Sequence, residues 1–236
     1  MANFSPREFD RRQMLRLLGA APIGLALGCG TSPGGVDASR SDAGVLVSDA
    51  SAPDAGFDAG VCSATDPDAR GPFFEAGSPA RAAIAGPEEP GTRLFITGSL
   101  LGVGGCAPLA GYTIDLWQAD VDGNYYTASS SDYRLRGRVV TGADGAFYFE
   151  SIKPGSYVTP TGPRPSHVHA SVYAPDGSER LTTQLYFVGD PYQGVDDGCQ
   201  PPTCFSGDPD RHIALESASV DGRDGLAGQL RIVVPA

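Results

Sequence analysis

Short apolar segments separated by glycine-containing turns constrain the fold of this chain more than any other feature. The segment 112–118 alternates apolar and polar residues, so Ile114 and Leu116 should lie on one face of a half-buried strand. Asp144-Gly145, between two further apolar segments, is typical of a hairpin turn. The same reasoning predicts strands at 93–101, 138–141, 146–149, 167–173, 181–188 and 230–234.

The spacing of these segments indicates an all-β fold. Turns recur about every ten residues, as in a β-sandwich. The chain has 32 Gly and 20 Pro but 2 Met, which favours turns over long helices. No segment between residues 90 and 236 has helical periodicity. We therefore expect residues 62–236 to form one domain, an antiparallel β-sandwich with long loops.

The N-terminus is predicted to be an export signal. Arg11 and Arg12 precede an apolar run, 15–27, that is too short to span a bilayer. The arginine pair resembles a twin-arginine signal, and the end of the run resembles a lipoprotein cleavage site with Cys29 as the lipidated residue. We expect residues 1–29 to direct export by the twin-arginine route. The mature protein would be a membrane-anchored lipoprotein. If the signal is instead cleaved near Cys29 without lipidation, it would be a periplasmic or extracellular protein.

Residues 30–61 have the composition of a linker. They repeat Asp, Ala, Gly and Ser and contain few aromatic residues, so they cannot bury enough apolar surface to offset the entropy of ordering. We expect a disordered tether between the signal and the domain. The linker contributes five Asp and one Arg to the net charge of −11, and an acidic chain lacks the basic surface that nucleic acid requires. We therefore expect no nucleic-acid partner.

The cysteines indicate disulfide chemistry. Apart from Cys29, the chain contains Cys62, Cys106, Cys199 and Cys204, an even number in an exported protein. Three pairings are open. We favour Cys62–Cys106 and Cys199–Cys204, because the second pair closes a short loop, with free thiols as the alternative. The spacing of Cys62 and Cys106 does not suit a structural zinc site.

Two of the three histidines, His167 and His169, lie two residues apart in a predicted strand. Alternate strand residues point to one face, so the two imidazoles form half of a candidate metal site. Tyr125 and Tyr157 follow turns nearby in the sequence. Phenolate oxygen is a hard anionic donor, and two phenolates with two imidazoles would suit Fe(III).

A set of motifs extends over about residues 71–190, at 116–125, 136–138, 141–145, 152–157, 164–169 and 181–187. Together and in this order, they resemble the intradiol ring-cleavage dioxygenases. The chain resembles the protocatechuate-type core more than the catechol-type enzymes, because we expect no sizeable N-terminal helical domain.

This resemblance implies a site and a reaction. The ligands of a non-haem Fe(III) would be Tyr125, Tyr157, His167 and His169. Arg164 and Gln184 would place the substrate and stabilise its charge, and Tyr157 would act as a base. The implied activity, in the catabolism of aromatic compounds, is cleavage of a catechol-type diol between its hydroxyl-bearing carbons with O₂. The product would be a muconate-type diacid, and a homo-oligomer is compatible with this interpretation.

Two residues near these motifs have other predicted roles. Tyr126 is a second tyrosine beside the proposed ligand, but the family pattern Gly-x-Tyr selects Tyr125. Neighbouring strand residues point to opposite faces, so one of the two can be the ligand. His212 lies beyond the matched region, and we interpret it as a surface or structural residue.

Two other functions compete with the dioxygenase. The segment 141–157 also resembles non-catalytic prealbumin-like sandwiches, which would make the protein a binding module at the cell surface. Arg164, Gln184 and the histidine pair favour the enzyme, because a binding module does not need them. A cupin-like oxygenase would require a Glu shortly after the histidine pair, and 170–174 contains none.

Overall fold

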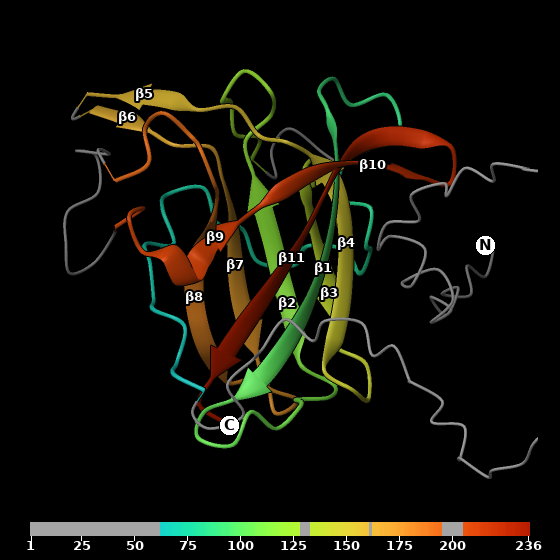
Figure 1. Ribbon diagram of the computed structural model, residues 1–236, viewed down its shortest axis with the longest axis vertical. Coiled ribbons are helices and arrows are strands. Elements are labelled where there is room, and N and C mark those ends of the chain that lie inside the picture. The colour runs from blue at the N-terminus through green and yellow to red at the C-terminus, as the bar shows by residue number, and fades with distance from the viewer. Residues whose placement is uncertain (1–61, 128–132, 161, 195–204) are drawn as a thin grey trace, which may run out of the picture. The chain divides into compact units, whose positions relative to one another are not determined.

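Two β-sheets form the body of the protein in the computed structural model (Figure 1), which describes residues 62–127, 133–160, 162–194 and 205–236. The predicted signal peptide, the linker and the Cys199–Cys204 pair lie outside these residues. The four-stranded sheet has the order β10-β11-β1-β4, and the five-stranded sheet has the order β3-β2-β7-β8-β9. The predicted all-β sandwich is confirmed.

The strands of the four-stranded sheet are β1 (Arg93–Gly102), β4 (Ala146–Ile152), β10 (Leu215–Val220) and β11 (Arg223–Val234). Those of the five-stranded sheet are β2 (Thr113–Gln118), β3 (Arg136–Val140), β7 (His167–Tyr173), β8 (Glu179–Phe187) and β9 (His212–Ile213). A small hairpin pairs β5 (Tyr157–Thr159) with β6 (Gly162–Arg164). A single helical turn, η2 (Pro209–Arg211), precedes β9. Within the described part of the chain, no helix is long and apolar enough to cross a membrane.

Among the described strands, most pairs are antiparallel, as predicted, but two are parallel. β1 pairs with β11 in parallel over its whole length, and β8 pairs with β9 in parallel. β1 and β11 are the first and last strands of the domain, so no hairpin turn determines their relative direction. The sequence reveals turns between neighbouring strands, and it therefore did not predict this long-range parallel pairing.

The core lies between the two sheets and follows the alternation of the strands. Ile114 and Leu116 of β2 are fully buried there, as predicted from the 112–118 pattern. Val168 and Ala170 of β7 belong to the same core. Since successive strand residues alternate between faces, His167 and His169 point to the outer face of the five-stranded sheet.

That outer face is covered by the segment 62–84, which we call the covering segment. The Asp68 amide donates a hydrogen bond to β8 at 2.9 Å, the Phe74 ring packs on a β2 tryptophan, and the Arg81 amide bonds to β3 at 3.0 Å. The segment thus crosses the sheet from β8 to β3. The outer face is therefore buried although it lies outside the main core, and the candidate site lies beneath this covering.

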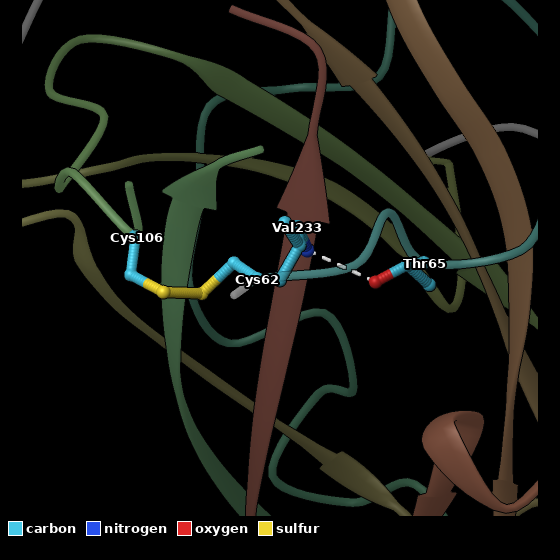
Figure 2. Close-up of a disulfide and its surroundings, with 4 residues drawn as sticks. All are labelled: Cys62, Thr65, Cys106 and Val233. Carbon is cyan, nitrogen blue, oxygen red and sulfur yellow. Dashed lines mark hydrogen bonds between the residues drawn. A yellow bond between two sulfur atoms is a disulfide. The ribbon is translucent and has the colours of Figure 1, made fainter. Parts of the chain in front are cut away.

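A disulfide anchors the start of the covering segment (Figure 2). Cys62 and Cys106 are bonded with their Cα atoms 5.3 Å apart, which confirms the predicted pair. Beside it, the amide of Val233 donates to the hydroxyl of Thr65, and the amide of Thr65 donates to the carbonyl of Val233, each at 2.9 Å. The segment is thus tied to β11 before it crosses the other sheet.

Candidate metal centre

The two histidines of β7 are buried side by side. His167 and His169 are 2% and 3% exposed, and their ring centroids are 4.8 Å apart. Nδ1 of His167 lies 2.6 Å from the carbonyl oxygen of Pro165. A carbonyl can only accept, so Nδ1 carries the proton and Nε2 keeps its lone pair. Both rings lie on the same face of β7, as the alternation of strand residues predicted.

The ring of His169 is held between the sheet and the covering segment. It stacks on the ring of Trp117, its partner across β2 and β7, with centroids 4.8 Å apart and planes 4° from parallel. On the covering side, a Cβ on Gly71 would lie 3.4 Å from the His169 ring. The imidazole is thus packed between Trp117 and the backbone of the covering segment at Gly71.

Tyr125 completes a convergence of three donor atoms. Its hydroxyl oxygen lies 3.1 Å from Nε2 of His167 and 3.0 Å from Nε2 of His169. Donors bound side by side to one cation at about 2.1 Å would lie about 3 Å apart, so this spacing fits a metal ion. Phe73, from the covering segment, stacks on the Tyr125 ring at 4.4 Å between centroids.

Tyr157 lies at the edge of the same group. Its ring centroid is 5.8 Å from those of Tyr125 and His167. Tyr157 begins β5 and is half-buried, and the Tyr125 phenol is the more deeply enclosed of the two. The structure thus brings all four sequence-predicted ligands into one cluster. Among the described residues, no three His, Cys, Asp or Glu side chains gather to hold a metal ion, so this cluster depends on tyrosine oxygen.

Burial controls the protonation of the cluster. It lowers the pKa of His167 to about 3, with a further contribution from the positive charge of Arg164. Burial likewise lowers the pKa of His169, so both imidazoles are neutral at pH 7 and can bind a metal. Burial and the neighbouring Tyr157 raise the pKa of the Tyr125 phenol. A trivalent cation would supply the positive charge that a buried phenolate requires.

The two tyrosines are carried on turns that interlock. The Gly155 amide donates to the Asp120 carbonyl at 2.8 Å, which joins the turn before Tyr157 to the turn before Tyr125. Gly123 has φ +84°, and a Cβ there would lie 2.8 Å from Cβ of Tyr157. Glycine is therefore required for this close approach.

Arg164 and Gln184 form a buried pair beside the histidines. Nη2 of Arg164 donates to Oε1 of Gln184 at 2.7 Å, and the side chains are 7% and 1% exposed. Gln184 lies opposite His169 in the pairing of β7 with β8. Because the guanidinium supplies only donors, this bond also determines which end of the amide faces it. The pair lies next to the cluster of the two tyrosines and two histidines.

Comparison with known proteins places the chain in a family. A family model described as Dioxygenase matches residues 70–201, more than half of the 236 residues. The chain belongs to the intradiol dioxygenase family. It is 39% identical over 150 residues to chlorocatechol 1,2-dioxygenase of Rhodococcus opacus, covering 54% of this chain and 58% of that protein. It is 36% identical over 124 residues to the protocatechuate 3,4-dioxygenase beta chain of Burkholderia cepacia, covering 48% and 52%.

The chain spans about half the length of the curated family members that it matches. The match to one solved structure extends over almost the full length of that structure's chain. The dioxygenase domain of a dioxygenase and carbohydrate-binding protein fusion from Streptomyces sp. SirexAA-E has a TM-score of 0.61 and 33% identity. That match covers 74% of this chain and 99% of the other.

Three residues near the site, Asp68, Arg211 and Tyr186, were not predicted from the sequence to belong to it. Asp68 and Arg211 form a buried ion pair, with side chains 0% and 2% exposed. The Tyr186 hydroxyl lies 2.8 Å from Oδ2 of Asp68 and 3.1 Å from Oε1 of Gln184, and burial and Asp68 raise its pKa. Asp68 and Arg211 are 143 residues apart, and no local pattern marks either. The network connects the covering segment and η2 to the Arg164–Gln184 pair.

The sequence argument treated Tyr125 and Tyr126 as neighbouring strand residues, but both lie in the connection between β2 and β3. The hydroxyl of Tyr126 bonds to Asp120 and does not join the cluster. His212 lies in β9, where its Nε2 is 2.7 Å from the Ser206 carbonyl, and its ring is 6.3 Å from that of Tyr186. The ring of His212 thus lies beside Tyr186 and does not join the two imidazoles of the cluster.

Proposed function

We propose that the protein is a non-haem Fe(III) dioxygenase that cleaves a catechol-type diol between its two hydroxyl-bearing carbons. The reaction inserts both atoms of O₂ and gives a muconate-type dicarboxylic acid. The observation that carries the proposal is the Tyr125 hydroxyl within 3.1 Å of both imidazole Nε2 atoms. Family membership, and relatives named for chlorocatechol and catechol, support the substrate class.

Iron is the cofactor that the donor set fits best. Two phenolates and two neutral imidazoles combine hard anionic oxygen with borderline nitrogen, which suits a hard trivalent cation better than a soft one. The residues that would hold it are Tyr125, Tyr157, His167 and His169. When bound, ferric iron supplies the Lewis acidity that draws electron density from a chelated diol and makes it reactive toward O₂.

The chain's own residues would handle the proton and the developing charge. Tyr157 is the less enclosed of the two tyrosines, so its phenolate oxygen is suited to accept a proton from the diol. Arg164 is held in place by Gln184 and remains beside the cluster as a positive charge. In this buried setting, that charge would stabilise negative charge on the substrate ring more strongly than it would in water.

The proposal is tested by loading the full chain with Fe(III). We expect a red-brown protein, from charge transfer between phenolate and Fe(III), and O₂ uptake with one of catechol, protocatechuate and hydroxyquinol. Product analysis should give a ring-opened diacid. Tyr157→Phe should shift or remove the visible band, whereas Tyr148→Phe, on the other sheet, should leave it unchanged. A colourless protein that consumes no O₂ would favour the alternative, a non-catalytic binding module.

We also propose that the protein works after export. The Cys62–Cys106 bond supports this, because disulfides persist mainly in oxidising compartments. Cell fractionation should find the wild-type chain with the membrane, and Cys29→Ala should release it. Replacing Arg11 and Arg12 by lysine should retain the precursor in the cytoplasm. If both variants fractionate as the wild type does, neither signal operates.

A further inference from the structure

Tyr125 lies in the connection between β2 and β3, outside any strand. A strand residue is oriented by the hydrogen bonds of its sheet, but a residue in a connection depends on the contacts of its neighbours. The hydroxyl of Tyr125 must nevertheless stay within 3.1 Å of two imidazoles. Its neighbour Tyr126 is attached to the protein at the hydroxyl, the ring and the backbone carbonyl.

The first attachment of Tyr126 is its hydroxyl. It donates a hydrogen bond of 2.6 Å to Oδ2 of Asp120. The other carboxylate oxygen, Oδ1, accepts the amide hydrogens of Asp122 and Asn124, each at 2.9 Å. Hydrogen bonds to a carboxylate are among the stronger ones in proteins. The hydroxyl of Tyr126 is thus tied to the turn that leads directly into Tyr125.

The second attachment is the aromatic ring. The guanidinium of Arg134 lies 3.9 Å from the centroid of the Tyr126 ring, within the range of a cation–π interaction. Arg134 is itself held by Glu89 through two hydrogen bonds, of 2.8 and 2.6 Å. Tyr126 also packs against a small apolar cluster that contains Leu135 and Ile152. The ring is therefore contacted by both a cation and apolar side chains.

The third attachment is the backbone carbonyl of Tyr126. It accepts hydrogen bonds from Nη2 and Nε of Arg136, at 2.6 and 3.2 Å. Arg136 is 2% exposed and lies on β3 opposite Trp117, whose ring stacks on His169. The Tyr126 carbonyl, next to Tyr125 in the chain, is therefore fixed to the sheet that carries the two histidines.

We propose that Tyr126 is a positioning residue, whose three attachments hold the hydroxyl of Tyr125 at the two imidazoles. The side chains of the two tyrosines reach different partners, Asp120 for one and the histidine pair for the other. Anchoring Tyr126 at three points fixes the backbone from which the Tyr125 side chain projects toward the two imidazoles. The inference rests on the proposed function, in which Tyr125 is an iron ligand.

Iron binding is the first test. Tyr126→Leu removes the hydroxyl and the ring, and we expect the apparent Fe(III) affinity of the full chain to fall roughly 10- to 100-fold. The visible band should weaken or shift, and kcat should fall more than KM rises. Tyr126→Phe keeps the ring under Arg134 and should restore part of the loss. Tyr148→Phe removes a hydroxyl on the other sheet and should bind iron as the wild type does.

The second test does not require iron. The chain has three histidines, so selective ¹⁵N-histidine labelling gives a simple spectrum. Before iron is added, Tyr126→Leu should shift the Nε2 resonances of His167 and His169, which lie next to Tyr125. The resonances of His212, which contacts the Ser206 carbonyl, should not move.

The two tests separate the two proposals. Shifted His167 and His169 resonances in a chain whose wild type binds no iron would support positioning and refute the proposed function. An active wild type whose Tyr126→Leu variant keeps its iron affinity, visible band and histidine resonances would overturn the positioning role alone. If Tyr126→Leu also moves the His212 resonances, the variant is globally perturbed and Tyr126→Phe decides the matter with the same measurements.

Discussion

The hydroxyl oxygen of Tyr125 lies 3.0 Å from Nε2 of His169, although 44 residues separate the two in the sequence. One residue lies in a connection and the other in the middle of a five-stranded sheet. Their meeting depends on interlocked turns on one side and on the stack with Trp117 on the other. The predictions below test the parts of this arrangement separately.

His169→Gln should abolish iron-dependent activity. It removes the Nε2 lone pair while keeping a side chain of similar size beside Trp117. Because a ligand is lost rather than a supporting contact, we expect a fall of more than about 100-fold in O₂ uptake. His212→Gln is the matched control and should retain most activity. Equal activity of the two variants would contradict the assignment of His169 as a ligand.

Asp68→Asn should destabilise the fold strongly, because it removes the fully buried countercharge of Arg211 and leaves the more exposed Asp208. Removing one partner of a buried pair lowers the free energy of unfolding by about 3–5 kcal/mol. Asp208→Asn is the control, since Asp208 contacts the same guanidinium at 3.0 Å from a more exposed position. We expect its effect to be about 1 kcal/mol or less. Urea unfolding of both variants measures the difference.

Loss of the Cys62–Cys106 bond should also destabilise the domain. The bond joins residues 44 positions apart, for which the chain-entropy model gives a stabilisation of about 4 kcal/mol. A chain with both cysteines replaced by serine should unfold at lower urea concentration than the wild type. Adding reductant to the wild type should move its midpoint toward that of the variant. An unchanged midpoint in both cases would show that the bond adds no stability.

The Asp120 carboxylate should make part of the free energy of unfolding depend on pH in the acidic range. Burial acts to raise its pKa, but hydrogen bonds from Tyr126, Asn124 and Asp122 outweigh burial and lower the pKa below 3.8. A pKa lower in the folded state means stability that is present above pH 3.8 and lost as the pH falls below it. Asp120→Asn should therefore lower the free energy of unfolding more at pH 6 than at pH 3. A difference that is the same at both pH values would contradict this.

The sequence alone determined the features that depend on local periodicity. Alternation placed Ile114 and Leu116 in the core between the two sheets. It also placed His167 and His169 together on the outer face of the five-stranded sheet. The motifs indicated the family, and of the three possible cysteine pairings the favoured one included Cys62–Cys106. The inferences from alternation succeed because a strand repeats every two residues wherever it is placed.

Only the tertiary structure decided which distant segments meet. The parallel pairing of β1 with β11, the crossing of the covering segment and the Asp68–Arg211 pair have no local signal. Each arises because two sheets and their connections must bury apolar surface and satisfy buried polar groups at the same time. The distinct roles of Tyr125 and Tyr126 follow in the same way, because adjacent identical side chains differ only in what surrounds them.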